Sequence, residues 1–176
     1  NNLKLDVSGS GVTVEFWMKK SGWITDHGDF TSQSNINAEC GPFGSEGDVA
    51  CEAIGNYHEI IFDLWNSGSA EANGRFVIST TSYYPGDFRV TVLSGSAYNE
   101  SNGASIRLSG SLSTLSDNSW HHHAITCYMS GSKLTSELYT DGVHVHTGEQ
   151  NIYDTNGDGS SIGPITGTML ATIGGA

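Results

Sequence analysis

The chain has 176 residues, which fits one domain with a sizeable core, and 36% of them are hydrophobic. Seven Lys plus Arg stand against nineteen Asp plus Glu, so the formal net charge is −12. Nucleic acids and anionic membranes both select cationic surfaces, so this balance argues against either as a partner. No apolar run of about 18 residues is present, which argues against insertion into a membrane.

The first predicted strand covers residues 12–19, where apolar residues alternate with polar or mixed ones. Residues 26–56 are rich in Gly, Ser, Asn and Asp and predict a long loop, which in a compact domain is often functional. Cys40 and Cys51 bracket part of this loop. We predict a disulfide between them, with free thiols as the alternative; a disulfide would indicate maturation outside a reducing cytosol.

The middle of the chain predicts four further strands, at residues 59–65, 75–80, 88–93 and 104–109. In the first of them, Ile60, Phe62 and Leu64 are expected to point inward. A last strand is predicted at residues 168–174, and no segment has a helical period. About ten short strands with tight turns predict an all-β, two-sheet antiparallel sandwich with little or no helix.

Residues 119–145 predict an antiparallel meander. Residues 120–129 and 134–140 alternate at period two around the turn 130–132, and His121, His123, Ile125 and Cys127 fall on one face. Asp141-Gly142 then favours a two-residue hairpin, because both residues tolerate positive φ. Cys127 is expected to be a buried small hydrophobe.

Several of these motifs resemble the laminin-G-like (concanavalin-A-like) jelly-roll family. The matching residues are Trp120, His121, His122 and Ala124 of a WHHxA strand, Leu138, Tyr139, Asp141 and Gly142 of an LYxDG hairpin, VTVEFWMK at 12–19, and TIGG at 172–175. The resemblance implies a single jelly-roll domain over residues 1–176. It is specific for fold rather than function, because the fold hosts lectins, adhesion modules, structural domains and glycosidases.

The context of the domain is a further expectation. The chain starts without Met and stops within a predicted strand, so we expect a domain excised from a longer polypeptide. The WHHxA strand and the ending GPITGTMLATIGG at 163–175 resemble domains of virion structural proteins of bacterial viruses. We therefore expect an extracellular or virion-surface location.

Calcium is the cofactor that the sequence suggests most strongly. Asp154, Asn156 and Asp158, followed by Gly159, copy the first half of an EF-hand loop, although Ile165 stands where a bidentate Glu would be needed. We predict a partial calcium site at these three residues, completed by other oxygen atoms. The alternative is an ordinary Asp/Asn/Gly turn without an ion.

The histidines offer a second, weaker metal hypothesis. His121 shares a face with His123, and His144 is expected to share one with His146, so paired strands could bring two couples together around zinc. Against zinc, the first couple shares its face with the core residues Ile125 and Cys127, and the family carries WHH as a structural element. We expect structural histidines.

Catalysis is disfavoured by the spacing of the acidic residues. The nearest match to a glycosidase pattern is Glu59 with Asp63, which an ideal strand would place on one face about 13 Å apart. That separation exceeds what glycoside hydrolysis uses, and no nucleophile elbow or phosphate loop is present. We expect a protein that is not an enzyme.

Aromatic side chains could stack on sugar rings. Tyr83, Tyr84 and Trp23 are the predicted ligand-binding residues, since the two tyrosines occupy a Pro-Gly turn. For Trp17 and Trp65 we expect core packing, because loops can cover the outer face of a sandwich.

Two functions remain open from the sequence. The first is a non-catalytic recognition or adhesion module that binds a cell-surface glycan or protein through rim loops. The second is a structural or decoration domain that contacts neighbouring subunits of a larger assembly, such as a phage capsid or fibre. A glycoside hydrolase is the least favoured alternative.

Overall fold

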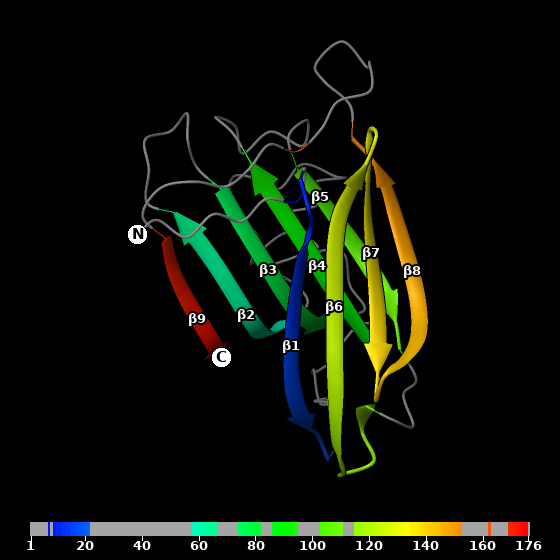
Figure 1. The fold of residues 1–176 in the computed structure, drawn as a ribbon. Coiled ribbons are helices and arrows are strands. Elements are labelled where there is room, and N and C mark those ends of the chain that lie inside the picture. The colour runs from blue at the N-terminus through cyan, green and yellow to red at the C-terminus, as the bar shows by residue number, and fades with distance from the viewer. Residues whose placement is uncertain are drawn as a thin grey trace, which may run out of the picture.

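The computed structural model describes residues 7, 9–21, 58–66, 74–81, 86–94, 103–110, 115–152, 162 and 169–175. These residues form nine strands in two antiparallel sheets, which confirms the predicted all-β two-sheet sandwich (Figure 1). The strands are β1 (Val12–Lys19), β2 (His58–Asn66), β3 (Gly74–Thr81), β4 (Asp87–Ser94), β5 (Gly103–Ser109), β6 (Trp120–Ser130), β7 (Lys133–Thr140), β8 (Val143–Asn151) and β9 (Met169–Gly175).

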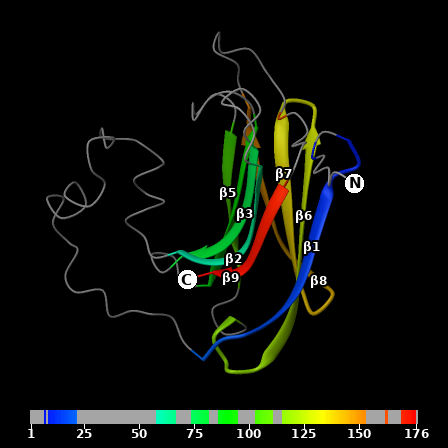
Figure 2. The ribbon, with the colours of Figure 1, turned by 90° about the vertical axis from the view of Figure 1, so that its left-hand side faces the viewer.

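The two sheets form separate layers, seen edge on in Figure 2. One sheet has four strands in the order β1-β6-β7-β8, and the other has five in the order β5-β4-β3-β2-β9. The predicted meander is therefore confirmed, because β6, β7 and β8 are neighbours in space as in sequence. Strand β1, which comes first in the chain, joins this meander by pairing with β6.

The core lies between the layers and follows the period-two pattern of the strands. From the four-stranded sheet, Ile125, Cys127 and Leu138 point inward and are fully buried. Phe76 and Phe88 meet them from the other sheet. Cys127 is a free, buried thiol whose pKa burial raises to about 11, so its expected role as a small hydrophobe is confirmed.

The turns of the meander use the residues that the sequence predicted. Asp141 has φ 52° and Gly142 has φ 79°, so both central residues of the β7–β8 hairpin lie in the left-handed region. Asp141 tolerates that conformation because a short polar side chain can make local hydrogen bonds there. The hairpin places Asp141 beside the start of β6, where its backbone N–H donates to the His122 carbonyl oxygen at 2.8 Å.

Two irregularities change the faces that the sequence pattern predicts. The pairing of β2 with β3 shifts between Ile60 and Phe62, so Ile61 is an extra residue and Glu59, rather than Ile60, lies on the inner side. The pairing of β7 with β8 shifts between Leu138 and Tyr139. In β2 and in β8 the predicted alternation therefore holds on one side of the shift and is inverted on the other.

One side of the sandwich is closed by contact between β5 and β8. The Ser105 N–H donates to Gln150 Oε1 at 2.8 Å, which links the two sheets. Gly148 of β8 packs directly on β5: an added Cβ would collide with Ile106 Cγ2 and lie 3.1 Å from the Arg107 carbonyl oxygen. The close approach of these strands therefore requires a residue without a side chain.

We expect Gly148→Ala to lower the free energy of unfolding by about 1–3 kcal/mol, because the added methyl group overpacks this contact. Urea unfolding followed by circular dichroism measures the change. Asn151→Ala, at an exposed position of the same strand, is the matched control and should change stability by less than about 0.5 kcal/mol. Equal stability of the two variants would contradict the proposed close packing.

Candidate functional site

The outer face of the four-stranded sheet carries a group of exposed aromatic side chains at one end. Trp17 of β1 lies opposite His122 of β6 in the strand register, and their ring centroids are 5.3 Å apart. Trp120 starts β6 opposite Lys19 and points to the same outer face, diagonal to Trp17. We call Trp17, Trp120 and His122 the aromatic end.

The two tryptophan side chains of the aromatic end are unusually exposed to solvent for such large apolar groups. Trp17 is 64% exposed and Trp120 is 63% exposed, although indole rings are among the side chains that bury the most apolar surface. Glu15 lies on the same face, with Oε2 3.6 Å from Nε2 of His122. The site therefore offers two indole surfaces beside groups that can accept or donate hydrogen bonds.

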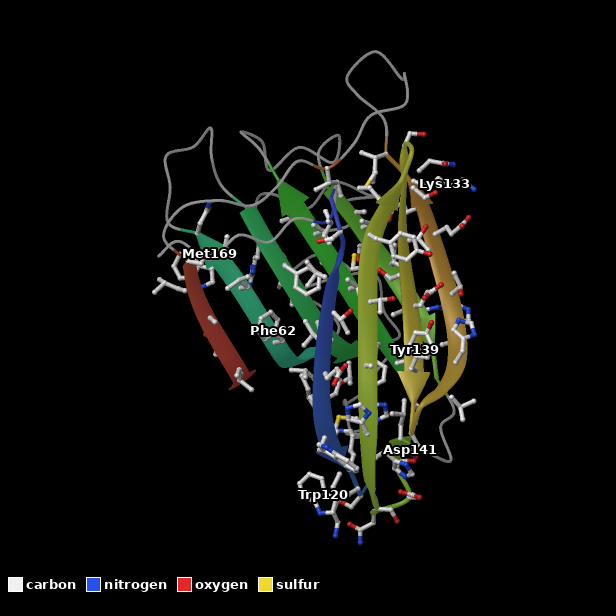
Figure 3. All side chains as sticks on the ribbon, in the orientation of Figure 1. Phe62, Trp120, Lys133, Tyr139, Asp141 and Met169 are labelled. Carbon is white, nitrogen blue, oxygen red and sulfur yellow. The ribbon has the colours of Figure 1, made fainter. Side chains whose placement is uncertain are left out.

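A charged bridge lies beneath this end of the sheet. His121 Nδ1 is 2.6 Å from Oδ2 of Asp141, and its Nε2 is 3.1 Å from Oδ2 of Asp117. Ionised carboxylates only accept hydrogen bonds, so the two contacts need a doubly protonated imidazole. The hydrogen bonds to Asp141 and then Asp117 raise the pKa of His121. Figure 3 labels Asp141 and Trp120 near the same end of the sheet.

The bridge holds the segment that leads into Trp120. Asp117 Oδ1 accepts the Ser119 backbone N–H at 2.8 Å, and this bond and the contact with His121 lower the pKa of Asp117. Asn118, between them, has φ 63° and donates its N–H to the Lys20 carbonyl oxygen at 3.0 Å. Such a conformation persists where surrounding contacts fix it. The backbone that leads into Trp120 is therefore held in place by these hydrogen bonds.

His123 lies on the same face of β6 as His121 but in an opposite environment. It is fully buried, packs against Phe16 and Phe88, and has its Nδ1 3.1 Å from Oγ1 of Thr140. Its Nε2 is buried without a hydrogen-bond partner among the described residues. Burial is the main reason that the pKa of His123 falls to about 4, so the ring is neutral near pH 7.

Most residues predicted from sequence to form sites lie outside the described part of the chain. These are the ligand-binding candidates Tyr83, Tyr84 and Trp23, the calcium candidates Asp154, Asn156 and Asp158, and the disulfide candidates Cys40 and Cys51. They remain predictions.

The expectation for two tryptophans is wrong. Trp17 is 64% exposed and Trp65 is 39% exposed, whereas we expected both to pack in the core. The strands alternate as predicted around both residues, with Trp65 beyond the register shift of β2, so both side chains point outward. The error was the assumption that loops cover the outer faces. Trp120 was not selected from sequence, although its alternation with the inward His121 and His123 already predicted an outward side chain.

The grouping of histidines also differs from expectation. The register shift in β8 pairs His144 with Tyr139 and His146 with Leu138, so these two histidines point to opposite faces. They cannot form a couple on one face. Within the described residues, no group of three or more His, Cys, Asp or Glu side chains is arranged to hold a metal ion.

Glu59 and Asp63 do not lie on one face as predicted. The extra residue Ile61 turns them to opposite sides of β2. Glu59 accepts from Lys20 Nζ at 2.6 Å, and Asp63 pairs with Arg75 at 2.7 Å. Each carboxylate therefore stabilises a cation from a neighbouring part of the fold, and the two do not face a common substrate position.

No protein-family model matches this chain, and no curated protein matches it. The described residues contain no helix with the length and apolar character needed to cross a membrane.

The His121 bridge should make stability depend on pH at the alkaline side. The pKa of His121 is higher in the folded chain than in the unfolded chain, where it is near 6.5. Protonated His121 therefore contributes its full stabilisation below pH 6.5, and this contribution is lost as the pH rises through the folded-state pKa. We expect the His121 ring, followed by NMR, to titrate above the ordinary histidine value near 6.5. Asp141→Asn should lower the His121 pKa. An unchanged titration in that variant would contradict the bridge.

His123 should act in the opposite sense at acid pH. Its folded-state pKa is depressed, so neutral His123 contributes fully to the stability of the fold above pH 6.5. As the pH falls from 6.5 toward 4, the free energy of unfolding should decrease by about 3 kcal/mol. Urea unfolding at several pH values measures this loss. His123→Phe should flatten the stability profile between these pH values. Ile125→Val, which changes a buried residue without a titratable group, serves as control and should keep the slope of the parent chain.

Proposed function

We propose that this chain is a non-catalytic recognition module that binds a glycan through the aromatic end. The observation that carries the proposal is the exposure of Trp17 and Trp120 on one open sheet face. Water contact with two large apolar rings is costly, and a ligand that covers them recovers that free energy. Tryptophan at the centre of a contact is also the residue type that most often dominates binding.

The polar groups around the indoles favour a sugar over a purely apolar ligand. Glu15 and the His122 ring stand beside Trp17 and can hydrogen-bond hydroxyl groups. Sugar rings have apolar C–H faces that suit an aromatic surface and hydroxyl edges that suit such neighbours. A few polar groups placed around aromatic side chains are typical of sites that orient a small ligand.

The non-catalytic part of the proposal is supported by the acidic residues of β2. Glu59 and Asp63, the carboxylates that best matched a glycosidase pattern, are each engaged by a cation and face opposite sides of the strand. Glycoside hydrolysis needs two carboxyl groups that flank one bond.

We also propose that the sandwich is a laminin-G-like jelly roll that works outside the cell or on a virion surface. The sequence motifs described above support that family, and the nine strands in two sheets are compatible with it. Calcium at Asp154, Asn156 and Asp158 stays a prediction.

A broad glycan screen on the isolated chain tests this function. We expect binding, and we expect Trp17→Ala or Trp120→Ala to weaken it about ten-fold or more, because each removes an exposed ring from the contact. Trp65→Ala is the matched control: it removes an exposed indole from the other sheet and should leave affinity unchanged.

The alternatives predict different results. Equal loss in the Trp65→Ala variant would show that the aromatic end is not the site. Binding that disappears in chelator would add calcium to the mechanism, whereas binding that persists would remove it. No binding by a folded chain would contradict glycan recognition and favour a structural domain that contacts neighbouring subunits.

A further inference from the structure

A second aromatic cluster lies on the same outer face, around Glu137 of β7. The Tyr139 hydroxyl donates to Glu137 Oε2 at 2.9 Å, and the Tyr128 hydroxyl donates to Oε1 at 3.4 Å. Thr126 adds a third hydroxyl donor at 3.4 Å. His144 packs edge-on against Tyr139, with ring centroids 5.2 Å apart. We call Tyr128, Tyr139 and His144 the tyrosine cluster.

Glu137 restrains the two tyrosine rings from opposite directions along the sheet. Tyr139 precedes the hairpin end of β7, whereas Tyr128 lies toward the other end of β6, and both hydroxyls converge on one carboxylate. The hydrogen bond to Glu137 is the main cause that raises the pKa of Tyr139, so its hydroxyl stays protonated and remains a donor. Rings that are already restrained lose less conformational entropy when a ligand covers them.

The two clusters are aligned along one strand. Trp120, His122 and Tyr128 occupy the outward positions of β6, and the residues between them on that face are the small Ala124 and Thr126. Tyr139 lies opposite Ala124, roughly 13 Å along β6 from Trp120, and Tyr128 lies roughly 26 Å from it. The distance along β6 is several times the length of one sugar ring. A single ring bound at the aromatic end would therefore not contact the tyrosine cluster.

The charges on this face select against an anionic ligand. Glu15 and Glu137 stand beside the line of outward β6 residues, and Glu137 is held by hydroxyl groups rather than by a cation in its described contacts. Two lysines share the face. Lys19 lies opposite Trp120 at the aromatic end, and Lys133, at the far end, is paired with Glu149 at 2.9 Å. With Glu149 counted, three carboxylates stand beside two ammonium groups on this face. With a net charge of −12 on the whole chain, uronate or sulfated sugars would meet repulsion along this path.

We propose that the ligand is a linear, uncharged polysaccharide chain that lies along β6, with one segment on the aromatic end and another on the tyrosine cluster. This inference rests on the proposed function and extends it from a terminal sugar to an extended chain. The contact is divided between two aromatic clusters on one rigid sheet, so affinity grows with ligand length until both clusters are covered.

The test is a length series measured by calorimetry. The probes are neutral cello-, manno- and N-acetylchito-oligosaccharides from disaccharide to hexasaccharide, with oligogalacturonates of the same lengths as the anionic comparison. For the neutral series that binds, we expect the hexasaccharide to bind at least about ten-fold more tightly than the disaccharide. The oligogalacturonates should bind more weakly at every length.

Substitutions test whether the tyrosine cluster causes the increase in affinity with ligand length. Tyr139→Ala should remove most of the length-dependent gain and leave disaccharide affinity unchanged, whereas Trp17→Ala should weaken both ligands. Tyr139→Phe keeps the ring and removes the hydroxyl that Glu137 holds, so it should retain part of the gain. It also serves as the milder variant if Tyr139→Ala does not fold.

Each outcome separates the two proposals. Disaccharide and hexasaccharide binding of equal strength, lost in Trp17→Ala and unaffected by Tyr139→Ala, would overturn the extended chain and leave the proposed function standing. Oligogalacturonate binding as tight as that of the neutral series would overturn the uncharged ligand. No binding of any probe by the folded chain would overturn both.

Discussion

The pairing of β6 with both of its neighbours is the constraint on which the rest of the structure depends. Because β6 is hydrogen-bonded to β1 on one side and β7 on the other, its alternate residues are assigned to two different environments. His123, Ile125 and Cys127 enter the core, and the same register directs Trp120 and His122 to the outer face. A shift by one residue would expose the core residues and bury the aromatic end, so stability and the candidate site share one register.

The inward face of β6 also shows how burial and neighbouring carboxylates set the charge of two histidine side chains. His121 stands at the end of the strand, where Asp117 and Asp141 can reach both ring nitrogens, so its charged form is favoured. His123, two residues further along, is enclosed by Phe16 and Phe88, and its neutral form is favoured. The ring centroids are 6.4 Å apart, so the charge on His121 further disfavours a charge on His123.

The outer face of the four-stranded sheet differs from the inner one in what holds its side chains. Inside, packing against the second sheet fixes each residue. Outside, hydrogen bonds such as those from Tyr139 and Tyr128 to Glu137 restrain rings that remain partly open to water. Both proposals follow from this arrangement, since a surface that is restrained and aromatic can receive a ligand with little further ordering.

The sequence by itself determined the elements that depend on local physical rules. Period-two alternation located β1 and β6, and Asp141-Gly142 predicted the hairpin, because strand geometry and positive φ are properties of neighbouring residues. Only the tertiary structure decided the rest. The extra residue Ile61, which separates Glu59 from Asp63, arises from pairing between strands, as does the shift that separates His144 from His146. The exposure of Trp17 and the bridge from His121 to Asp117 and Asp141 depend on which distant segments meet or leave a face uncovered, and no local pattern contains that information.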